Sequence, residues 1–358
     1  MLECLLVSNY RSLVDTWIQF GQVTVVTGPN GSGKSNLYRA LQLLQAAATG
    51  RFSETLLAEG GMPSALWAGE RSKGPVRMTF AAHWDDLTHE LNAGLQRTSK
   101  ENPFVLDPEI KEEYVYLSPK RSKSTTLLDR SKGFGWVIPT EGDTRQITSL
   151  SRSESMLSQV GEPGQFPELA TLVHRMSGWR FYHQFDTGPT SPLRRPQPGV
   201  RVDALASDGL NLGAAMATLT ERGDSGALHE AVDKAFPGYA AMVEAERGVF
   251  SVGMHAPGIR RPLSALELSD GQLRFLCLAV ALLSTRPPEM LVLNEPENSL
   301  HPRAVAALAP LIVEASRYSQ VWVTTHDSIL RDALAPHATV SELSISGGVT
   351  SVHAVESN

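Results

Sequence analysis

GPNGSGKS, at residues 28–35, fits the pattern of a glycine, any four residues and then Gly-Lys-Ser that forms a phosphate-binding P-loop. An apolar run at residues 23–26 precedes it and predicts a strand, and Leu37, Leu41 and Leu44 follow at the spacing of one helix face. Glycines allow successive backbone N–H groups to surround phosphate oxygens, and the helix start adds its positive dipole end. A glycine-rich turn without function is the alternative, which this strand and helix context disfavours. The chain is therefore expected to bind a nucleoside triphosphate.

The side chains of the loop predict how the nucleotide is held. Lys34 would reach the β- and γ-phosphates, and the Ser35 hydroxyl would ligate Mg²⁺. The expected nucleotide contacts are Asn30, Gly31, Ser32, Gly33, Lys34, Ser35 and Asn36.

Three further motifs lie near the other end of the chain. LSDGQ at residues 268–272 is followed by an apolar strand that ends in Asn294-Glu295-Pro296, and a second apolar strand, residues 321–325, ends at His326. Each is weak alone, but P-loop, LSDGQ signature, acidic strand end and histidine occur in the order used by ABC-type ATPases, which the chain resembles.

The finer resemblance is to the RecF, SMC and OLD branch of that class. It rests on NYRSL at residues 9–13, GPNGSGKSN at 28–36, NEPENSLHP at 294–302 and TTHDS at 324–328. It implies an α/β P-loop NTPase fold: an ABC/SMC/RecF-type ATPase head with an antiparallel β subdomain and an inserted compact, mostly helical arm. It also implies that Arg11 contacts the nucleotide.

In this class two heads enclose ATP, so the resemblance implies a composite site in which one subunit supplies the signature to the other. Ser269 and Gly271 would present N–H groups at a helix start to the γ-phosphate, although Ser269 also suits a plain N-cap. Glu295 is the candidate general base, against the alternative of a surface glutamate. His326 would donate a hydrogen bond to the γ-phosphate, against a structural role.

Two departures from the family pattern bear on turnover. Asn294 stands where the family has the aspartate that supports Mg²⁺, so Ser35 and Asn294 are the predicted metal-side residues. No glutamine marks the start of a Q-loop, and residues 60–69 occupy about the right place without one. A slow ATPase is therefore expected, or a nucleotide-gated binding module with negligible turnover that recruits an effector.

Bulk composition indicates an ordinary globular protein. The chain has 358 residues, 42% hydrophobic and 20% charged, with a net charge of −6 that disfavours a generally DNA-coating surface. Its two cysteines, Cys4 and Cys277, lie in apolar runs and are expected to be buried thiols in a reducing cytosol. No signal peptide and no membrane-spanning apolar stretch is visible, so a cytoplasmic protein is expected, and a transporter ATPase would need a separate membrane partner. A transporter ATPase is disfavoured by the run at residues 297–302 and by the RecF-like opening at residues 9–13.

The clearest basic cluster consists of Lys120, Arg121, Lys123, Arg130 and Lys132. Because runs of charge are usually solvated surface, the DNA-binding interpretation competes with that simpler one. Arg194-Arg195 and Arg260-Arg261 are weaker candidates.

The expected organisation is a split head. Residues 1–150 form its N-terminal part with the antiparallel β region, 151–262 the arm, and 263–358 the C-terminal part, which closes with a hairpin at Gly347-Gly348. The arm shows no heptads, which excludes a long SMC-type coiled coil. The residues after His326 are too few for the TOPRIM domain of OLD nucleases, so any nuclease is expected from a partner chain.

These observations predict a RecF/OLD-like ATPase that uses ATP and Mg²⁺, forms an ATP-dependent homodimer and acts on DNA or on a DNA-processing effector or nuclease supplied in trans. DNA repair and anti-phage defence both suit it.

Overall fold

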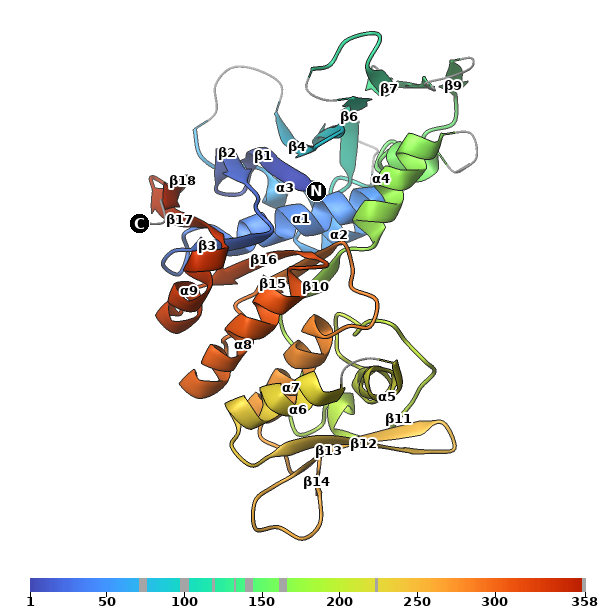
Figure 1. Ribbon diagram of the computed structural model, residues 1–358. Coiled ribbons are helices and arrows are strands. Elements are labelled where there is room, and N and C mark those ends of the chain that lie inside the picture. The colour runs from blue at the N-terminus through green and yellow to red at the C-terminus, as the bar shows by residue number, and fades with distance from the viewer. Residues whose placement is uncertain are drawn as a thin grey trace. The chain divides into compact units, whose positions relative to one another are not determined.

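The structure, a computed structural model, describes residues 1–70, 76–96, 103–117, 120–131, 133–138, 144–160, 166–222 and 225–355 (Figure 1). The described chain forms two compact units. The first consists of Met1–Gly21, Gly28–Trp179 and Ser341–Val355, and the second mainly of Gln22–Thr27 and Arg180–Val340. The division into a split head and an arm at residues 150 and 262 describes the chain differently and stays a prediction.

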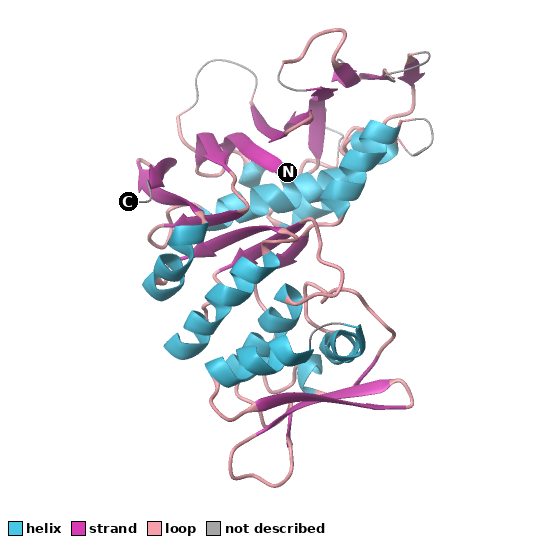
Figure 2. Ribbon diagram, viewed as in Figure 1, coloured by secondary structure: helices cyan, strands magenta, loops and turns pink. Residues whose placement is uncertain are grey.

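The first unit is built on an antiparallel sheet of eight strands, in the order β2-β1-β4-β5-β6-β7-β8-β9. Figure 2 draws the strands in magenta and the helices in cyan. In β2, buried and more exposed side chains alternate, because successive residues of a strand point to opposite faces of the sheet. This confirms the predicted antiparallel β region. The strands are β1 (Leu2–Tyr10), β2 (Leu13–Gln19), β4 (Arg77–Trp84), β5 (Leu87–Leu95), β6 (Pro108–Leu117), β7 (Thr126–Ser131), β8 (Phe134–Val137) and β9 (Arg145–Ile147).

The helix after the P-loop, α1 (Lys34–Ala48), buries the face that carries Leu37, Leu41 and Leu44, as predicted. The predicted hairpin joins β17 (Thr339–Ser346) to β18 (Val349–Val355). Gly347 and Gly348 both have positive φ, which two-residue hairpin turns of the primed type require. The remaining helices of this unit are α2 (Phe52–Ala58), α3 (Gly61–Ala65), η1 (Leu157–Gln159) and α4 (Pro167–Ser177).

The second unit contains a run of parallel strands in the order β10-β15-β16-β3. Every residue of β3, β15 and β16 is buried, which explains why these strands read as continuous apolar runs without alternation. The strands predicted before the P-loop, before Glu295 and before His326 are thereby confirmed. Their bounds are β3 (Val23–Thr27), β10 (Arg180–Tyr182), β15 (Met290–Asn294) and β16 (Gln320–Thr325).

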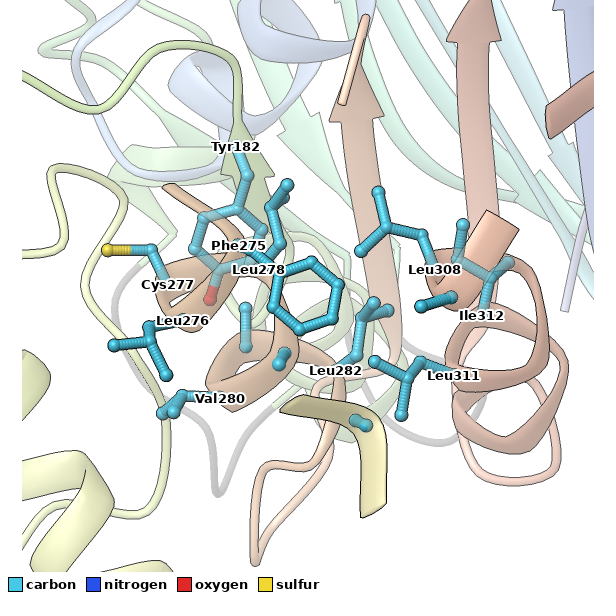
Figure 3. Close-up of a cluster of buried hydrophobic side chains, with 14 of the residues drawn as sticks. Tyr182, Phe275, Leu276, Cys277, Leu278, Val280, Leu282, Leu308, Leu311 and Ile312 are labelled. Carbon is cyan, nitrogen blue, oxygen red and sulfur yellow. The ribbon is translucent and has the colours of Figure 1, made fainter. Parts of the chain in front are cut away.

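The core of this unit lies around α7 (Asp270–Leu282), which is buried on all sides from Leu273 onward and is correspondingly apolar there except for Arg274. Figure 3 shows Phe275 and Leu278 of α7 among side chains of β10 and of α8 (Pro302–Ala315). The other helices of the unit are α5 (Leu212–Arg222), α6 (Ser225–Ala235), η2 (Pro192–Arg194), α9 (Ser328–Leu334) and η3 (Ala335–His337).

A small antiparallel sheet accompanies these helices, with strands β11 (Gln197–Pro198), β12 (Ala240–Glu246), β13 (Val249–His255) and β14 (Leu263–Ser264). Strands β12 and β13 were not predicted from the sequence. The Pro- and Gly-rich residues 187–199 contain only η2 and β11.

A buried polar group lies inside the antiparallel sheet. Glu113 of β6 and His89 of β5 are both fully buried, with 2.9 Å between Glu113 Oε1 and His89 Nε2. Ser155 Oγ donates to Glu113 Oε1, and the Met156 N–H donates to Oε2 at 2.6 Å. Burial alone would raise the pKa of Glu113, but the hydrogen bonds from His89, Ser155 and Met156 outweigh it and lower the pKa.

We expect Glu113→Gln to destabilise the protein by about 3 kcal/mol at pH 7, because the glutamine amide places N–H donors among groups that already donate. The pKa of Glu113 is lower in the folded protein than in the unfolded chain, where it is about 4.3. The carboxylate therefore contributes its full stabilisation above about pH 4.3, and this stabilisation is lost as the pH falls through the pKa of the folded state. Urea unfolding at pH 7 and near pH 3 measures the free energy of unfolding. The difference in this free energy between wild type and variant should be smaller near pH 3 than at pH 7.

The matched control is Glu54→Gln, which removes a carboxylate from the exposed ion pair with Arg51 on α2. It should leave the free energy of unfolding nearly unchanged, because exposed ion pairs contribute little to stability. An equal effect of the two substitutions at pH 7 would contradict a stabilising role of the buried Glu113.

Candidate functional site

The P-loop starts where the chain leaves β3 at Thr27, and it depends on glycine at two positions. Gly28 has φ of +145° and Gly33 of +108°. A Cβ at Gly28 would lie 2.5 Å from the Leu343 carbonyl oxygen, and one at Gly33 would lie 2.3 Å from Thr350 Oγ1. Any other residue would therefore be strained in its backbone and would clash with its neighbour.

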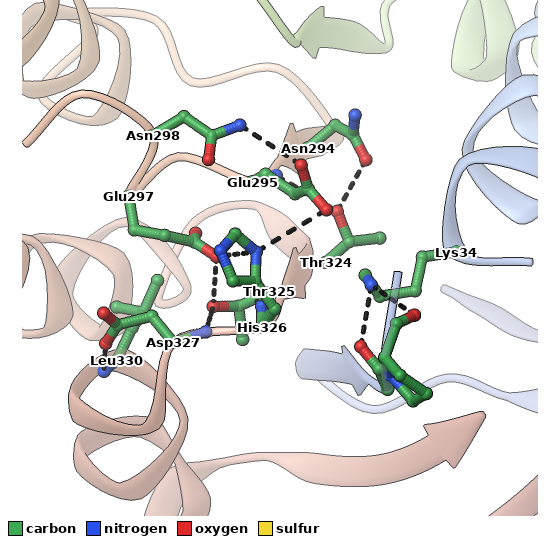
Figure 4. Close-up of polar contacts among 12 residues, drawn as sticks. Lys34, Asn294, Glu295, Glu297, Asn298, Thr324, Thr325, His326, Asp327 and Leu330 are labelled. Atoms are coloured by element: carbon green, nitrogen blue, oxygen red, sulfur yellow. Dashed lines mark hydrogen bonds and ion pairs between the residues drawn. The ribbon is translucent and has the colours of Figure 1, made fainter. Parts of the chain in front are cut away.

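Lys34 lies inside the loop it belongs to. Its side chain is buried, and Nζ donates to the carbonyl oxygens of Gly28 at 2.7 Å and Pro29 at 3.1 Å (Figure 4). The ammonium group is thus held by the backbone at the start of α1, where the helix dipole also favours an anion. This is the arrangement expected for a phosphate-binding lysine.

The other predicted contacts differ in exposure. Asn30, Gly31 and Ser35 are exposed, whereas Ser32 and Gly33 are buried. Asn36 Nδ2 donates to Ser12 Oγ at 2.8 Å, so its side chain is directed at the turn between β1 and β2.

Arg11 lies in that same turn, with φ of +49°. Its Nε and Nη2 donate to Glu59 Oε2 at 3.1 and 3.0 Å, and the Tyr10 hydroxyl donates to the same oxygen at 2.6 Å. Glu59, which the sequence analysis did not single out, therefore holds the guanidinium. A nucleotide contact by Arg11 stays a prediction.

The carboxyl ends of the parallel strands form one edge of the sheet. The register pairs Asn294 at the end of β15 with Thr324 of β16, and Thr325 with Thr27 of β3. Glu295 comes next, with φ of +48°, an uncommon conformation for a residue with a side chain. Its N–H donates to the Thr324 carbonyl at 3.0 Å, which holds the chain in this turn. Backbone strain held in this way is typical of functional sites.

Glu295, Glu297 and His326 form one group at this edge (Figure 4). Glu297 is buried, and its Oε1 accepts from Thr325 Oγ1 at 2.7 Å and from the His326 N–H at 2.9 Å, with His326 Nδ1 at 3.2 Å. Glu295 Oε1 lies 3.7 Å from the same Nδ1. Glu297 thus fixes the position of the histidine, and Glu295 is the more exposed carboxylate, at 21% against 4%.

Roles were predicted from the sequence for Glu295 and His326 but not for Glu297. The available signal was its place in NEPENSLHP, two residues after the strand-end glutamate. Spacing alone does not show that its carboxylate turns back onto the end of β16.

Both the oxygen and the nitrogen of the Asn294 side-chain amide have a partner. Oδ1 accepts from Thr324 Oγ1 at 2.6 Å, and Nδ2 lies 2.5 Å from Nδ1 of His183, the residue after β10. His183 and the following Gln184 were not singled out from the sequence, although they come after the short apolar strand Arg180–Tyr182. Because β10 pairs with β15, they lie at the same sheet edge as Asn294.

The signature motif occupies the start of α7. Ser269 Oγ accepts from the Gln272 N–H at 3.2 Å, and Gln272 Oε1 accepts from the Ser269 N–H at 2.9 Å, which is a complete capping box. A Cβ at Gly271 would lie 2.8 Å from the Ser299 carbonyl oxygen. The N-cap role of Ser269 is therefore present, and its contact with a nucleotide stays a prediction.

Two arginines considered for a basic surface are buried instead. Arg194 pairs with Asp270 of the signature at 2.6 Å and donates to the carbonyl oxygens of Ala265 and Leu268. Arg130 donates to the carbonyl oxygens of Ser151 and Glu154. Both interpretations as surface cations were wrong, because these guanidinium groups satisfy buried carbonyl oxygens.

Lys120, Arg121 and Lys123 are exposed, and the Arg121 guanidinium lies 3.7 Å from the centroid of the Tyr114 ring. Lys132 lies outside the described residues. In Arg260-Arg261, the other weak candidate for DNA binding, Arg261 forms an ion pair with Glu267. The described basic cluster is thus reduced to these three residues.

A P-loop after a buried parallel strand, a capped signature helix, and acidic and histidine strand ends define a P-loop ATPase of the ABC/SMC class. Solved SMC head domains have this fold. The Thermotoga maritima head matches with a TM-score of 0.51 and 18% identity over 99% of both chains. A head with an extended coiled coil, bound to the C-terminal domain of Pyrococcus furiosus ScpA, matches with 0.57 and 16% over 99% of this chain and 96% of that one. At these identities the likeness shows the fold.

Residues 23–332 match the family model described as "AAA domain, putative AbiEii toxin, Type IV TA system", and the chain belongs to that family of ATPases. A shorter match is to the phosphate import ATP-binding protein PstB 2 of Shouchella clausii (strain KSM-K16), 42% identical over 64 residues. It covers 18% of this chain and 23% of that protein. Within the part of the chain that is described, no helix is long and apolar enough to cross a membrane.

We expect Lys34→Ala to abolish ATP binding, because the phosphates would keep backbone donors but lose the ammonium charge. Isothermal calorimetry of ATP measures the effect, with Lys123→Ala as a control that removes an exposed lysine. ATP affinity in Lys34→Ala equal to that of wild type would refute the assignment of the phosphate site.

Proposed function

We propose that this chain is a RecF/OLD-like ATPase that hydrolyses ATP with Mg²⁺ as a homodimer and acts on DNA or on a DNA-processing partner. The observation that carries the hydrolytic part is the group of Glu295, Glu297 and His326 at the ends of β15 and β16. The RecF/OLD character is supported by the NYRSL and NEPENSLHP stretches.

Glu295 is the proposed general base. It would accept the proton of the water that attacks the γ-phosphate. Asn298 Nδ2 donates to its Oε2 at 3.1 Å, and the hydrogen bonds of the turn restrict its backbone, so the carboxylate is held before substrate arrives. Glu297 contacts the His326 ring at Nδ1, which leaves Nε2 for a phosphate oxygen, and both contacts are donated together when the ring carries a proton on each nitrogen.

The proposed Mg²⁺ would be held chiefly by the phosphates and by the exposed Ser35 hydroxyl. Among the residues with described coordinates, no group of three or more His, Cys, Asp and Glu side chains could hold a metal ion by itself. Asn294 Oδ1 accepts one hydrogen bond already and could accept a second from a metal-bound water. Such a site fits Mg²⁺, which retains waters and uses few protein ligands.

Gln184 is the proposed counterpart of the Q-loop glutamine that the sequence analysis did not find. It comes after β10 and the His183 that contacts Asn294, so it stands beside the acidic strand end. Residues 60–69 instead contain α3.

Dimerisation is proposed from the signature. Ser269 is exposed at the start of α7, where a helix N-terminus can bind the γ-phosphate held by a second subunit. Arg194 supports this turn from inside by pairing with Asp270. The capping box and this ion pair would hold the signature turn before a second subunit arrives, which would lower the entropic cost of association.

Glu295→Gln should bind ATP, lose at least about 100-fold in turnover because the base is removed, and accumulate as a dimer. Steady-state phosphate release measures the turnover, and light scattering with ATP measures the mass. Glu314→Gln on the exposed face of α8 is the control.

Two outcomes separate the alternatives. If wild type releases phosphate no faster than Glu295→Gln, the chain is the nucleotide-gated binding module and not a working ATPase. If the variant stays monomeric while saturated with ATP at micromolar protein, the composite site is refuted.

DNA binding is a second proposal, supported by the family resemblance and by the exposed cations Lys120, Arg121 and Lys123. Reversing all three to glutamate should weaken binding to any DNA sequence, with a shallower dependence on salt because fewer phosphates are neutralised. Fluorescence anisotropy of a labelled duplex at two salt concentrations measures both quantities. The control reverses the exposed Lys234, Arg260 and Arg317. Equal losses in the two triple variants would assign the effect to net charge.

A further inference from the structure

A chain of three hydrogen bonds reaches the P-loop from the C-terminal hairpin. Asn36 Nδ2 donates to Ser12 Oγ at 2.8 Å, Ser12 Oγ lies 2.7 Å from Thr350 Oγ1, and Thr350 Oγ1 donates to the Ser32 carbonyl oxygen at 2.9 Å. Ser12 lies in the turn between β1 and β2, and Thr350 lies on β18.

The direction of donation along this series of hydrogen bonds is set by the groups at its two ends. The Asn36 amide nitrogen can only donate, and the Ser32 carbonyl oxygen can only accept. The single proton of Thr350 therefore goes to Ser32, and the Ser12 proton goes to Thr350. Each hydroxyl both accepts and donates, an arrangement in which neighbouring hydrogen bonds strengthen one another.

The last bond sets the direction of a phosphate-binding donor. The Ser32 C=O and the Gly33 N–H belong to one planar trans peptide, so they point in opposite directions. When the carbonyl is directed at Thr350, the Gly33 N–H is directed away from it, as P-loop phosphate binding by backbone N–H groups requires. Thr350 also occupies the space that a Cβ of residue 33 would need, 2.3 Å from Oγ1.

We infer that Thr350 is a positioning residue for nucleotide binding, with Ser12 and Asn36 supporting it. Ser32 and Thr350 are both buried, so water does not readily replace the hydroxyl. The inference rests on ATP binding at the P-loop and is independent of dimerisation and of DNA.

The test is Thr350→Val, which keeps the side-chain shape and the Thr350 N–H bond to the Ser12 carbonyl but leaves the Ser32 oxygen buried without a donor. The loop then leaves its binding conformation, and ATP affinity should fall by about 10-fold. Thr350→Ser, which restores the hydroxyl, should stay within about twofold of wild type. Calorimetric titration of ATP and of ADP measures the affinities, and a thermal melt without nucleotide accompanies each.

Ser344→Ala is the matched control, because it removes an exposed hydroxyl from the same hairpin. Ser12→Ala gives a second reading if Thr350→Val does not fold, with an expected loss of about threefold through the weakened Thr350 hydroxyl. A lower melting temperature with wild-type affinities in Thr350→Val would overturn the inference, as would equal losses in the Val and Ser variants. Wild type that does not bind ATP would refute the P-loop assignment instead.

Discussion

The parallel strands β10, β15, β16 and β3 end at one edge of a buried sheet, and the chemistry of the protein depends on the residues directly after these strands. The P-loop comes after β3, His183 after β10, Glu295 after β15 and His326 after β16. Parallel pairing brings the ends of β10, β15, β16 and β3 together because all four strands run in the same direction. Buried backbone hydrogen bonds hold the register, so His183, Glu295 and His326 receive fixed positions although they are far apart in sequence.

Two residues of the loops that follow these strands, Gly33 and Glu295, have positive φ, and each is fixed by neighbouring hydrogen bonds: Thr350 on the Ser32 carbonyl, and Thr324 on the Glu295 N–H. Glycine adopts this conformation without strain, whereas at Glu295 the stability of the surrounding strands offsets the local strain. A binding loop held before the nucleotide arrives loses less conformational entropy when it binds.

Buried cations in this protein have similar hydrogen-bond partners but different roles. Lys34 rests on carbonyl oxygens of the P-loop, where a phosphate can take their place as its partner. Arg194 and Arg130 also donate to carbonyl oxygens, yet they only connect segments of the fold. The difference lies in location: Lys34 stands at the start of a helix beside exposed loop residues, whereas the two arginines are enclosed.

Local pattern was enough for the P-loop, its flanking strand and helix, the strands before Glu295 and His326, and the turn at Gly347-Gly348, because each depends on neighbours in sequence. It could not show that Glu297 turns onto His326, that His183 meets Asn294, or that Arg130 and Arg194 are buried. Those contacts form only once the chain has folded, because they join distant residues: 21 positions separate Arg130 from Ser151, and 111 separate His183 from Asn294. Thr350, 318 residues from Ser32, is the extreme case, since nothing near it in the sequence marks it as part of a phosphate site.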